Sequence, residues 1–338
     1  MPGKRSAGLL LSGAVSVALL LLLMRGVPWG DVAGSVARAS RPGLALYAAV
    51  TVAALWLRAL RFRVLLAPPR PGTGPLFLAT AVQNCLGDLV PARLASFGSW
   101  VWLLVRRLAV APEPAAATFL VSFVLDFATL GPLLALAVLM RLDAAAGILP
   151  AGFGVGWVAA LGGALFAASA LVILALGPAA RAAAGTLGGA TAASSRRRAL
   201  AVRLEALAAA LDGTRRAGTL LPAFALSAGI RLAKYVALAA LMSALLDGLG
   251  VATARPGFWD LIIGISATEI VASLPIPALG QFGVWEGGLV GSFVLLGFER
   301  GPATIVAVGI HAITQAFEYA LGALALGVIA ATKRAARD

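Results

Sequence analysis

The sequence predicts an all-α polytopic membrane protein, a bundle of helices that crosses the bilayer many times. Of the 338 residues, 61% are hydrophobic and 12% are charged, and the mean hydropathy is +0.96. Soluble domains have roughly 45–50% apolar and about 25% charged residues. The apolar residues form runs long enough to span the hydrocarbon core as helices, which takes about 20 residues. The run 9–24 does not alternate between apolar and polar residues as membrane barrel strands do, so helices are expected.

Nine apolar runs mark the expected elements in order. They cover about residues 7–24, 44–57, 76–105, 115–140, 155–176, 219–246, 258–274, 284–298 and 303–331. The first run follows Lys4 and Arg5, like a secretory signal peptide, but it is longer than a usual signal core and no small-residue cleavage site follows it. We therefore expect it to remain as the first span of a single transmembrane domain, residues 1–338.

Basic residues gather between the apolar runs. The net charge is +13, and Lys occurs only at Lys4, Lys234 and Lys333. This preference for Arg, with the many Ala and Gly residues, favours a bacterial genome rich in G and C. Short loops rich in Lys and Arg stay in the cytoplasm, so we interpret the charge as orienting the chain in a cell membrane rather than as binding nucleic acid. The basic segments 58–70, 106–107, 177–218 and 333–337 then predict cytoplasmic N- and C-termini.

These segments lie on one side of the membrane only if residues 76–105 enter it and return to the same face. A full span there would place Arg106, Arg107 and the segment 177–218 outside. The interior of 76–105 is also polar for a helix that faces lipid, and irregular backbone at that depth requires cover from protein or water. The sequence therefore predicts a re-entrant hairpin, whose polar residues are Gln83, Asn84, Asp88, Pro91 and Arg93.

The segment 177–218 contains a further predicted helix at about 196–212. Leu200, Leu204, Leu207 and Leu211 recur there at helical spacing, among Arg and acidic residues. Such a helix suits the membrane interface. A cytoplasmic connector packed under the bundle is an equally good interpretation.

An internal repeat is indicated by two similar stretches. Residues 91–100 read Pro-Ala, a short gap and then Phe-Gly-x-Trp, and residues 277–285 show the same order with a gap one residue shorter. If the chain is duplicated, residues 258–298 form a second hairpin that enters from the opposite face, as in inverted repeats. Two full spans over 258–298 fit the charges equally well.

Ionisable groups inside apolar runs are costly unless they are paired or wetted, so they are functional candidates. The first group is Asn84, Asp88 and Arg93, with Asp126 in the following run. Arg93, a bidentate donor, is expected to hold a lipid phosphate, or else to form a structural pair with Asp88. Asp126 has no basic neighbour in sequence and needs a partner on another helix.

The second group is Glu269, Gln281 and Glu286, flanked by Pro and Gly residues that expose backbone groups to a ligand. Glu286 has an alternative role as the cap of a broken helix. We interpret Arg231 and Lys234 as snorkelling cations, and His311 with Glu318 as a packing pair on one helix face.

The common enzyme and metal motifs are missing from the sequence. It has no Gly-x-Ser-x-Gly, no His-Glu-x-x-His and no phosphate loop ending in Gly-Lys-Ser/Thr. Cys85 and His311 are the only residues of their types, so no intrachain disulfide, no metal site and no cofactor are expected.

Several short motifs together resemble the lysylphosphatidylglycerol synthase transmembrane-region family. The resemblance covers nearly the whole chain and is carried by residues 58–62 (Arg-Ala-Leu-Arg-Phe), Asn84 followed by Pro91-Ala92-Arg93, Asp126, and residues 277–286 from Pro-Ala to Trp-Glu. It implies a bundle that moves lipids between leaflets. The synthases also carry a cytosolic aminoacyl-transferase domain after the bundle, and we expect no such activity from these 338 residues.

The predicted function is therefore lipid translocation, flippase-like or scramblase-like, with a phospholipid or another phosphate-bearing lipid as the membrane partner. The predicted substrate-binding residues are Asn84, Asp88, Arg93, Asp126, Glu269, Gln281 and Glu286. One alternative is a membrane transferase for a lipid-linked substrate, with Asp126 or Glu269 as general base. Another is an accessory subunit of a partner enzyme.

Overall fold

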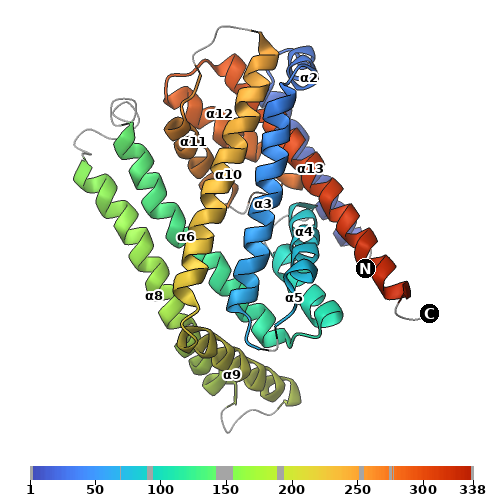
Figure 1. Ribbon diagram of the computed structural model, residues 1–338, viewed down its shortest axis with the longest axis vertical. Helices are drawn as coiled ribbons and strands as arrows, with labels where there is room; N and C mark the ends of the chain where they lie inside the picture. Colours follow the sequence, from blue (N-terminus) through green and yellow to red (C-terminus); the bar gives the residue numbers. More distant parts are fainter. Residues whose placement is uncertain are drawn as a thin grey trace.

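The computed structural model describes residues 3–68, 70–89, 94–141, 155–188, 194–250, 255–273, 276 and 278–335. These residues form twelve α-helices and one 3-10 turn, and no strand occurs among them (Figure 1). The predicted all-α fold class is confirmed. The elements are α1 (Gly3–Leu23), α2 (Trp29–Ala37), α3 (Arg41–Leu65), α4 (Thr73–Leu89), α5 (Leu94–Leu108), α6 (Pro112–Met140), α8 (Val155–Gly188), α9 (Ser195–Arg216), α10 (Leu220–Leu249), α11 (Phe258–Ala272), η1 (Leu279–Gln281), α12 (Val284–Leu295) and α13 (Arg300–Ala335).

Five of the described helices are long and apolar enough to cross a membrane, namely α3, α6, α8, α10 and α13. Each has 25 to 36 residues, and at 1.5 Å per residue each exceeds the roughly 30 Å hydrocarbon core. Many of their large apolar side chains are exposed, for example Leu171, Leu221 and Leu324. A lipid environment accounts for this outward apolar surface.

Helices α3 and α10 form the centre of the bundle and run antiparallel (Figure 1). A Cβ atom at Gly43 would lie 2.8 Å from Ala244 Cβ, and one at Gly229 would meet Leu57. Small residues at these positions let the two backbones approach closely, which is the main source of packing energy between helices in lipid.

Two pairs of shorter helices fold back on themselves, α4 with α5 and α11 with α12. Helix α4 follows the C-terminal end of α3, and α11 follows the C-terminal end of α10, so the pairs enter the bundle from opposite ends (Figure 1). Their 12 to 17 residues correspond to roughly 18–26 Å at 1.5 Å per residue, too short for a full span. The re-entrant position of these pairs in a membrane stays a prediction, and residues 90–93 of the first lie outside the described part of the chain.

The two halves of the bundle repeat at a constant spacing. Helix α4 begins at Thr73 and α11 at Phe258, 185 positions later. The same shift brings Phe97-Gly98 onto Phe282-Gly283 and Trp100 onto Trp285. Packing follows the same scheme, because α4 packs on α13 while α11 packs on α6. With α3 and α10 antiparallel, this is the arrangement expected of the predicted inverted repeat.

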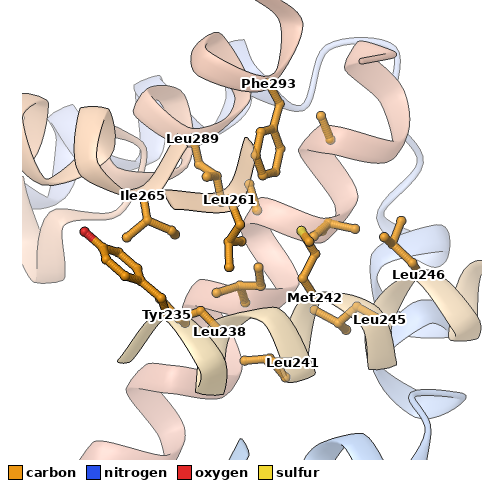
Figure 2. Packing of buried hydrophobic residues seen from close by; sticks show 14 of the residues in the cluster. Tyr235, Leu238, Leu241, Met242, Leu245, Leu246, Leu261, Ile265, Leu289 and Phe293 are labelled. Carbon is orange, nitrogen blue, oxygen red and sulfur yellow. The ribbon is translucent and has the colours of Figure 1, made fainter. Parts of the chain in front are cut away.

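The largest buried apolar cluster lies where α10, α11 and α12 meet. Figure 2 shows Leu241 and Leu245 of α10 facing Leu261 of α11 and Leu289 and Phe293 of α12. Gly264 allows this contact, because a Cβ there would lie 2.7 Å from the Phe293 ring. The cluster fixes α11 and α12 against the central helix.

Helices α8 and α9 separate the two halves in the sequence and pack on α6 at the edge of the bundle (Figure 1). Residues 196–212, where the sequence predicts a helix, lie within α9, and the place of this helix at the membrane interface stays a prediction. Helix α8 continues to Gly188 through Pro178, beyond the expected end at residue 176. Proline at 178 leaves the Leu174 carbonyl without its helical donor, and Arg215 of α9 donates to that oxygen at 3.3 Å. An ion pair between Arg181 and Asp212 adds a second link.

Candidate functional site

A cavity of about 380 Å³ lies between the two halves of the bundle. Side chains from α3, α4, α5, α6, α10, α11, η1, α12 and α13 line it. Four of the predicted site residues lie on its wall: Asn84, Asp126, Glu269 and Gln281. Glu286 is fully buried beside it, while Arg93 and the side chain of Asp88 lie outside the described residues.

Asp126 finds its partner on α3, as its isolation in the sequence required. Arg61 Nη1 donates to Asp126 Oδ1 at 2.5 Å and to the Ser227 hydroxyl at 2.8 Å. The Arg61 side chain is only 2% exposed, whereas that of Asp126 is 35% exposed toward the cavity. This ion pair joins α3, α6 and α10 at one point.

Glu269 accepts from two cations of α10. Arg231 Nη1 donates to Oε2 at 2.8 Å, and Lys234 Nζ donates to Oε1 at 2.5 Å. Arg231 also donates to the Asp126 carbonyl at 2.7 Å, which connects this cluster to α6. The interpretation of Arg231 and Lys234 as snorkelling cations is therefore wrong: they face inward and hold Glu269.

Arg58 is the cavity cation that sequence reasoning missed. It was assigned with Arg61 to a cytoplasmic loop, but α3 continues to Leu65 and places both guanidinium groups on the cavity wall. Arg58 Nη1 donates to Asn84 Oδ1 at 2.9 Å. No described carboxylate forms an ion pair with it. The signal in the sequence was the spacing of three between the two arginines, which puts them on one helix face.

Glu286 serves as the cap of α12, as the alternative interpretation predicted. Its Oε2 accepts from the Gly283 N–H at 2.7 Å, and its Oε1 lies 2.8 Å from His311 Nδ1. The expected pairing of His311 with Glu318 is therefore not the contact that forms. Glu318 lines the cavity instead, without an ion pair to any described cation.

The chain is broken between α11 and α12. Gly280, Gln281 and Gly283 have φ values of +56°, +59° and +85°, and glycine is the residue that adopts this region without steric cost. The Gln281 amide donates to the Ala272 carbonyl at 3.3 Å, and the Leu279 N–H donates to Ser16 of α1 at 2.8 Å. The break places Gln281 on the cavity wall, and the exposure of its backbone groups to a ligand stays a prediction.

Equivalent positions of the two halves meet at this cavity. A shift of 185 positions relates Asn84 to Glu269 and Asp126 to His311. Two of the acids, Asp126 and Glu269, are neutralised by described Arg and Lys side chains. Arg58 and Glu318 also line the cavity, and neither takes part in an ion pair among the described residues. No group of three or more potential metal ligands occurs among the described side chains.

Comparison with known proteins identifies the family. No curated protein gives a significant match to the chain. The family described as lysylphosphatidylglycerol synthase TM region matches residues 9–322, which include every residue that lines the cavity. That range and the long apolar helices make this a multi-pass helical membrane protein. The chain belongs to the lysylphosphatidylglycerol synthase transmembrane-region family.

Proposed function

We propose that this chain moves a phosphate-bearing lipid between the two leaflets of a cell membrane. The observation that carries the proposal is Arg58, a guanidinium on the wall of an intramembrane cavity whose described hydrogen bond goes to a neutral amide oxygen. Such a group is costly in lipid. A bidentate phosphate is the partner that best matches its planar donors.

The size of the cavity supports a headgroup as the ligand. A volume of about 380 Å³ is at the small end of ligand pockets, which measure roughly 300–1,000 Å³. It holds a phosphate with its polar substituent and leaves the acyl chains in the bilayer. Glu318 on the same wall suits a headgroup that also carries an amine.

The two-halved architecture supports movement rather than static binding. Transporters built from inverted repeats place the substrate site at the interface of the repeats and expose it alternately by rocking one against the other. Here broken or paired short helices from both halves border the cavity. The membrane-transferase alternative gains no comparable support, since both candidate bases, Asp126 and Glu269, are held by cations.

The test is lipid exchange in liposomes that contain the purified protein and fluorescent phospholipids, followed by leaflet-selective quenching. The wild type is expected to accelerate exchange over protein-free vesicles, and Arg58→Ala to slow it. A hydrogen bond to a charged group is worth about 1.5–3 kcal/mol, so the expected loss is about tenfold to hundredfold.

The matched control is Arg63→Ala, on the same helix. Arg63 is exposed and donates to Thr73 at 3.3 Å, away from the cavity. Wild-type exchange rates in Arg58→Ala, with normal folding and insertion, would overturn the assignment of Arg58. No acceleration by the wild type with anionic, zwitterionic or polyprenyl-phosphate lipids would overturn the proposed function.

A further inference from the structure

A chain of three hydrogen-bonded side chains lies beside the cavity and is not used by the proposed phosphate site. It consists of Glu286 on α12 and of His311 and Gln315 on α13. The Glu286 side chain is completely buried and His311 is 5% exposed, with its ring on the cavity wall. Phe282 stacks on the imidazole at 4.5 Å between ring centroids. The ring is therefore fixed in orientation, with one nitrogen toward Glu286.

This acid has a different kind of partner from the other acids of the site. Asp126 and Glu269 are held by Arg and Lys, whose charge is permanent at physiological pH. Glu286 is held by histidine, the side chain whose charge ordinarily changes between about pH 5 and 8. In the inverted repeat, His311 lies 185 positions after Asp126 and therefore occupies the position equivalent to that acid. The two halves therefore place an acid and a histidine at equivalent positions, and the histidine can become positively charged.

The contacts of His311 with Glu286 and Gln315 fit two protonation states of the ring. The Gln315 amide nitrogen can only donate, and it lies 3.1 Å from His311 Nε2. With the amide in this orientation, Nε2 is the acceptor and Nδ1 carries the proton toward Glu286. The Gln315 side-chain oxygen is buried and has no hydrogen-bond partner. Turning the amide over in place would bring this oxygen to Nε2, where it would accept from an imidazolium N–H. Gln315 can therefore satisfy the ring in both protonation states.

Other charged and titratable groups surround the dyad at the cavity. Glu318, on the same helix, favours an additional positive charge, and Arg58 and Lys234 oppose it. Helix α4 contributes the neutral amides Gln83 and Asn84. The remaining titratable groups on the wall are Tyr47 and Arg61 of α3, Asp126 of α6 and Glu269 of α11, and Tyr319 of α13 lies near Gly280.

We propose that Glu286 and His311 form a proton-binding site that couples lipid movement to a proton gradient. A proton from the cavity binds His311 Nε2, Glu286 compensates the new positive charge, and the Gln315 amide turns to accept from the new N–H. Release of the proton restores the neutral ring. The coupling rests on the proposed lipid transport, whereas the proton site itself does not.

The first test measures the proton site without any transport. His311 is the only histidine in the chain, so ¹⁵N-labelled histidine gives the signal of one residue in the reconstituted protein. We expect the neutral Nδ1–H tautomer at high pH and a doubly protonated ring when the pH is lowered. Gln315→Leu removes the acceptor for the second N–H and should weaken the signal of the doubly protonated ring. Thr304→Ala, on the same helix with a hydroxyl that bonds only the Arg300 carbonyl, should leave it unchanged.

The second test measures coupling in liposomes with an imposed pH difference. If one proton moves with each lipid, one pH unit gives about tenfold lipid accumulation, and His311→Asn should abolish that accumulation while keeping a donor toward Glu286. A histidine that keeps one protonation state from pH 4 to 9, or an Nε2–H tautomer at high pH, would overturn the proton site. Lipid movement unaffected by the gradient would overturn the coupling alone. No lipid movement in any condition, with a normal histidine titration, would instead refute the proposed function.

Discussion

Removing Asp126 should destabilise the protein more than removing its partner Arg61. Arg61 is 2% exposed and its charge is compensated by Asp126 alone among the described carboxylates, whereas Asp126 is 35% exposed to the cavity and can be hydrated there. Leaving a buried charge without its partner costs about 3–5 kcal/mol. Asp126→Ala should therefore cost about this much, and Arg61→Leu less, about 1–3 kcal/mol, the range for a polar group that loses one partner.

The double variant Arg61→Leu with Asp126→Ala completes a double-mutant cycle for this ion pair. It removes both charges and leaves Ser227 with its bond to the Ala223 carbonyl, so its stability should lie closer to the wild type than that of Asp126→Ala. The assay is equilibrium unfolding in mixed micelles, followed by Trp fluorescence. Equal losses in the two single variants, or additive losses in the double variant, would show that the pair is not the buried, mutually dependent contact that the geometry indicates.

Three further predictions concern other parts of the fold. Glu269→Gln should destabilise the protein more than Lys234→Met, because it leaves the buried charge of Arg231 without a partner, whereas Arg231 still pairs with Glu269 when Lys234 is removed. Thermal unfolding in detergent compares the two variants, and the reverse order of stability would contradict this assignment. Gly162→Leu should separate α6 from α8, because a Cβ at Gly162 would lie 2.5 Å from Ala135 Cβ. A cysteine crosslink engineered between the two helices should then be lost, and crosslinking at wild-type yield would argue against the close packing. Ser194→Ala removes the N-cap hydroxyl that accepts from the Arg197 N–H and should destabilise α9 by about 1 kcal/mol. Amide hydrogen exchange in the first turn of α9 measures this loss, and an unchanged exchange rate would show that the cap is not needed.

The helices were predictable from the sequence because their signals are local. Long apolar runs predicted α3, α6, α8, α10 and α13, and the polar interior of 76–105 predicted the short helices α4 and α5. The predicted helix boundaries were wrong where tertiary contacts replace a local signal. Gly177-Pro178 reads as a helix end, yet α8 continues there because Arg215 supplies the donor that the proline lacks.

The site was predictable by residue type but not by partner. Apolar context identified Asn84, Asp126, Glu269 and Gln281, and all four line the cavity. For three of them the partners lie 26 to 65 positions away on other helices, as in Arg58–Asn84, Arg231–Glu269 and Arg61–Asp126, and no sequence periodicity indicates such pairs. His311 illustrates the limit: spacing on one helix suggested Glu318, whereas folding brings it to Glu286 on α12. Binding of a substrate by these residues stays a prediction.

Lipid exchange in liposomes tests the central claim most directly, because it requires no assumption about the residues involved. Vesicles with the wild-type protein and a labelled phospholipid in one leaflet should exchange that lipid faster than protein-free vesicles. Arg58→Ala should lose most of the acceleration, and Arg63→Ala should keep it. Exchange at the protein-free rate for every phosphate-bearing lipid, by protein that is folded and inserted, would contradict the account.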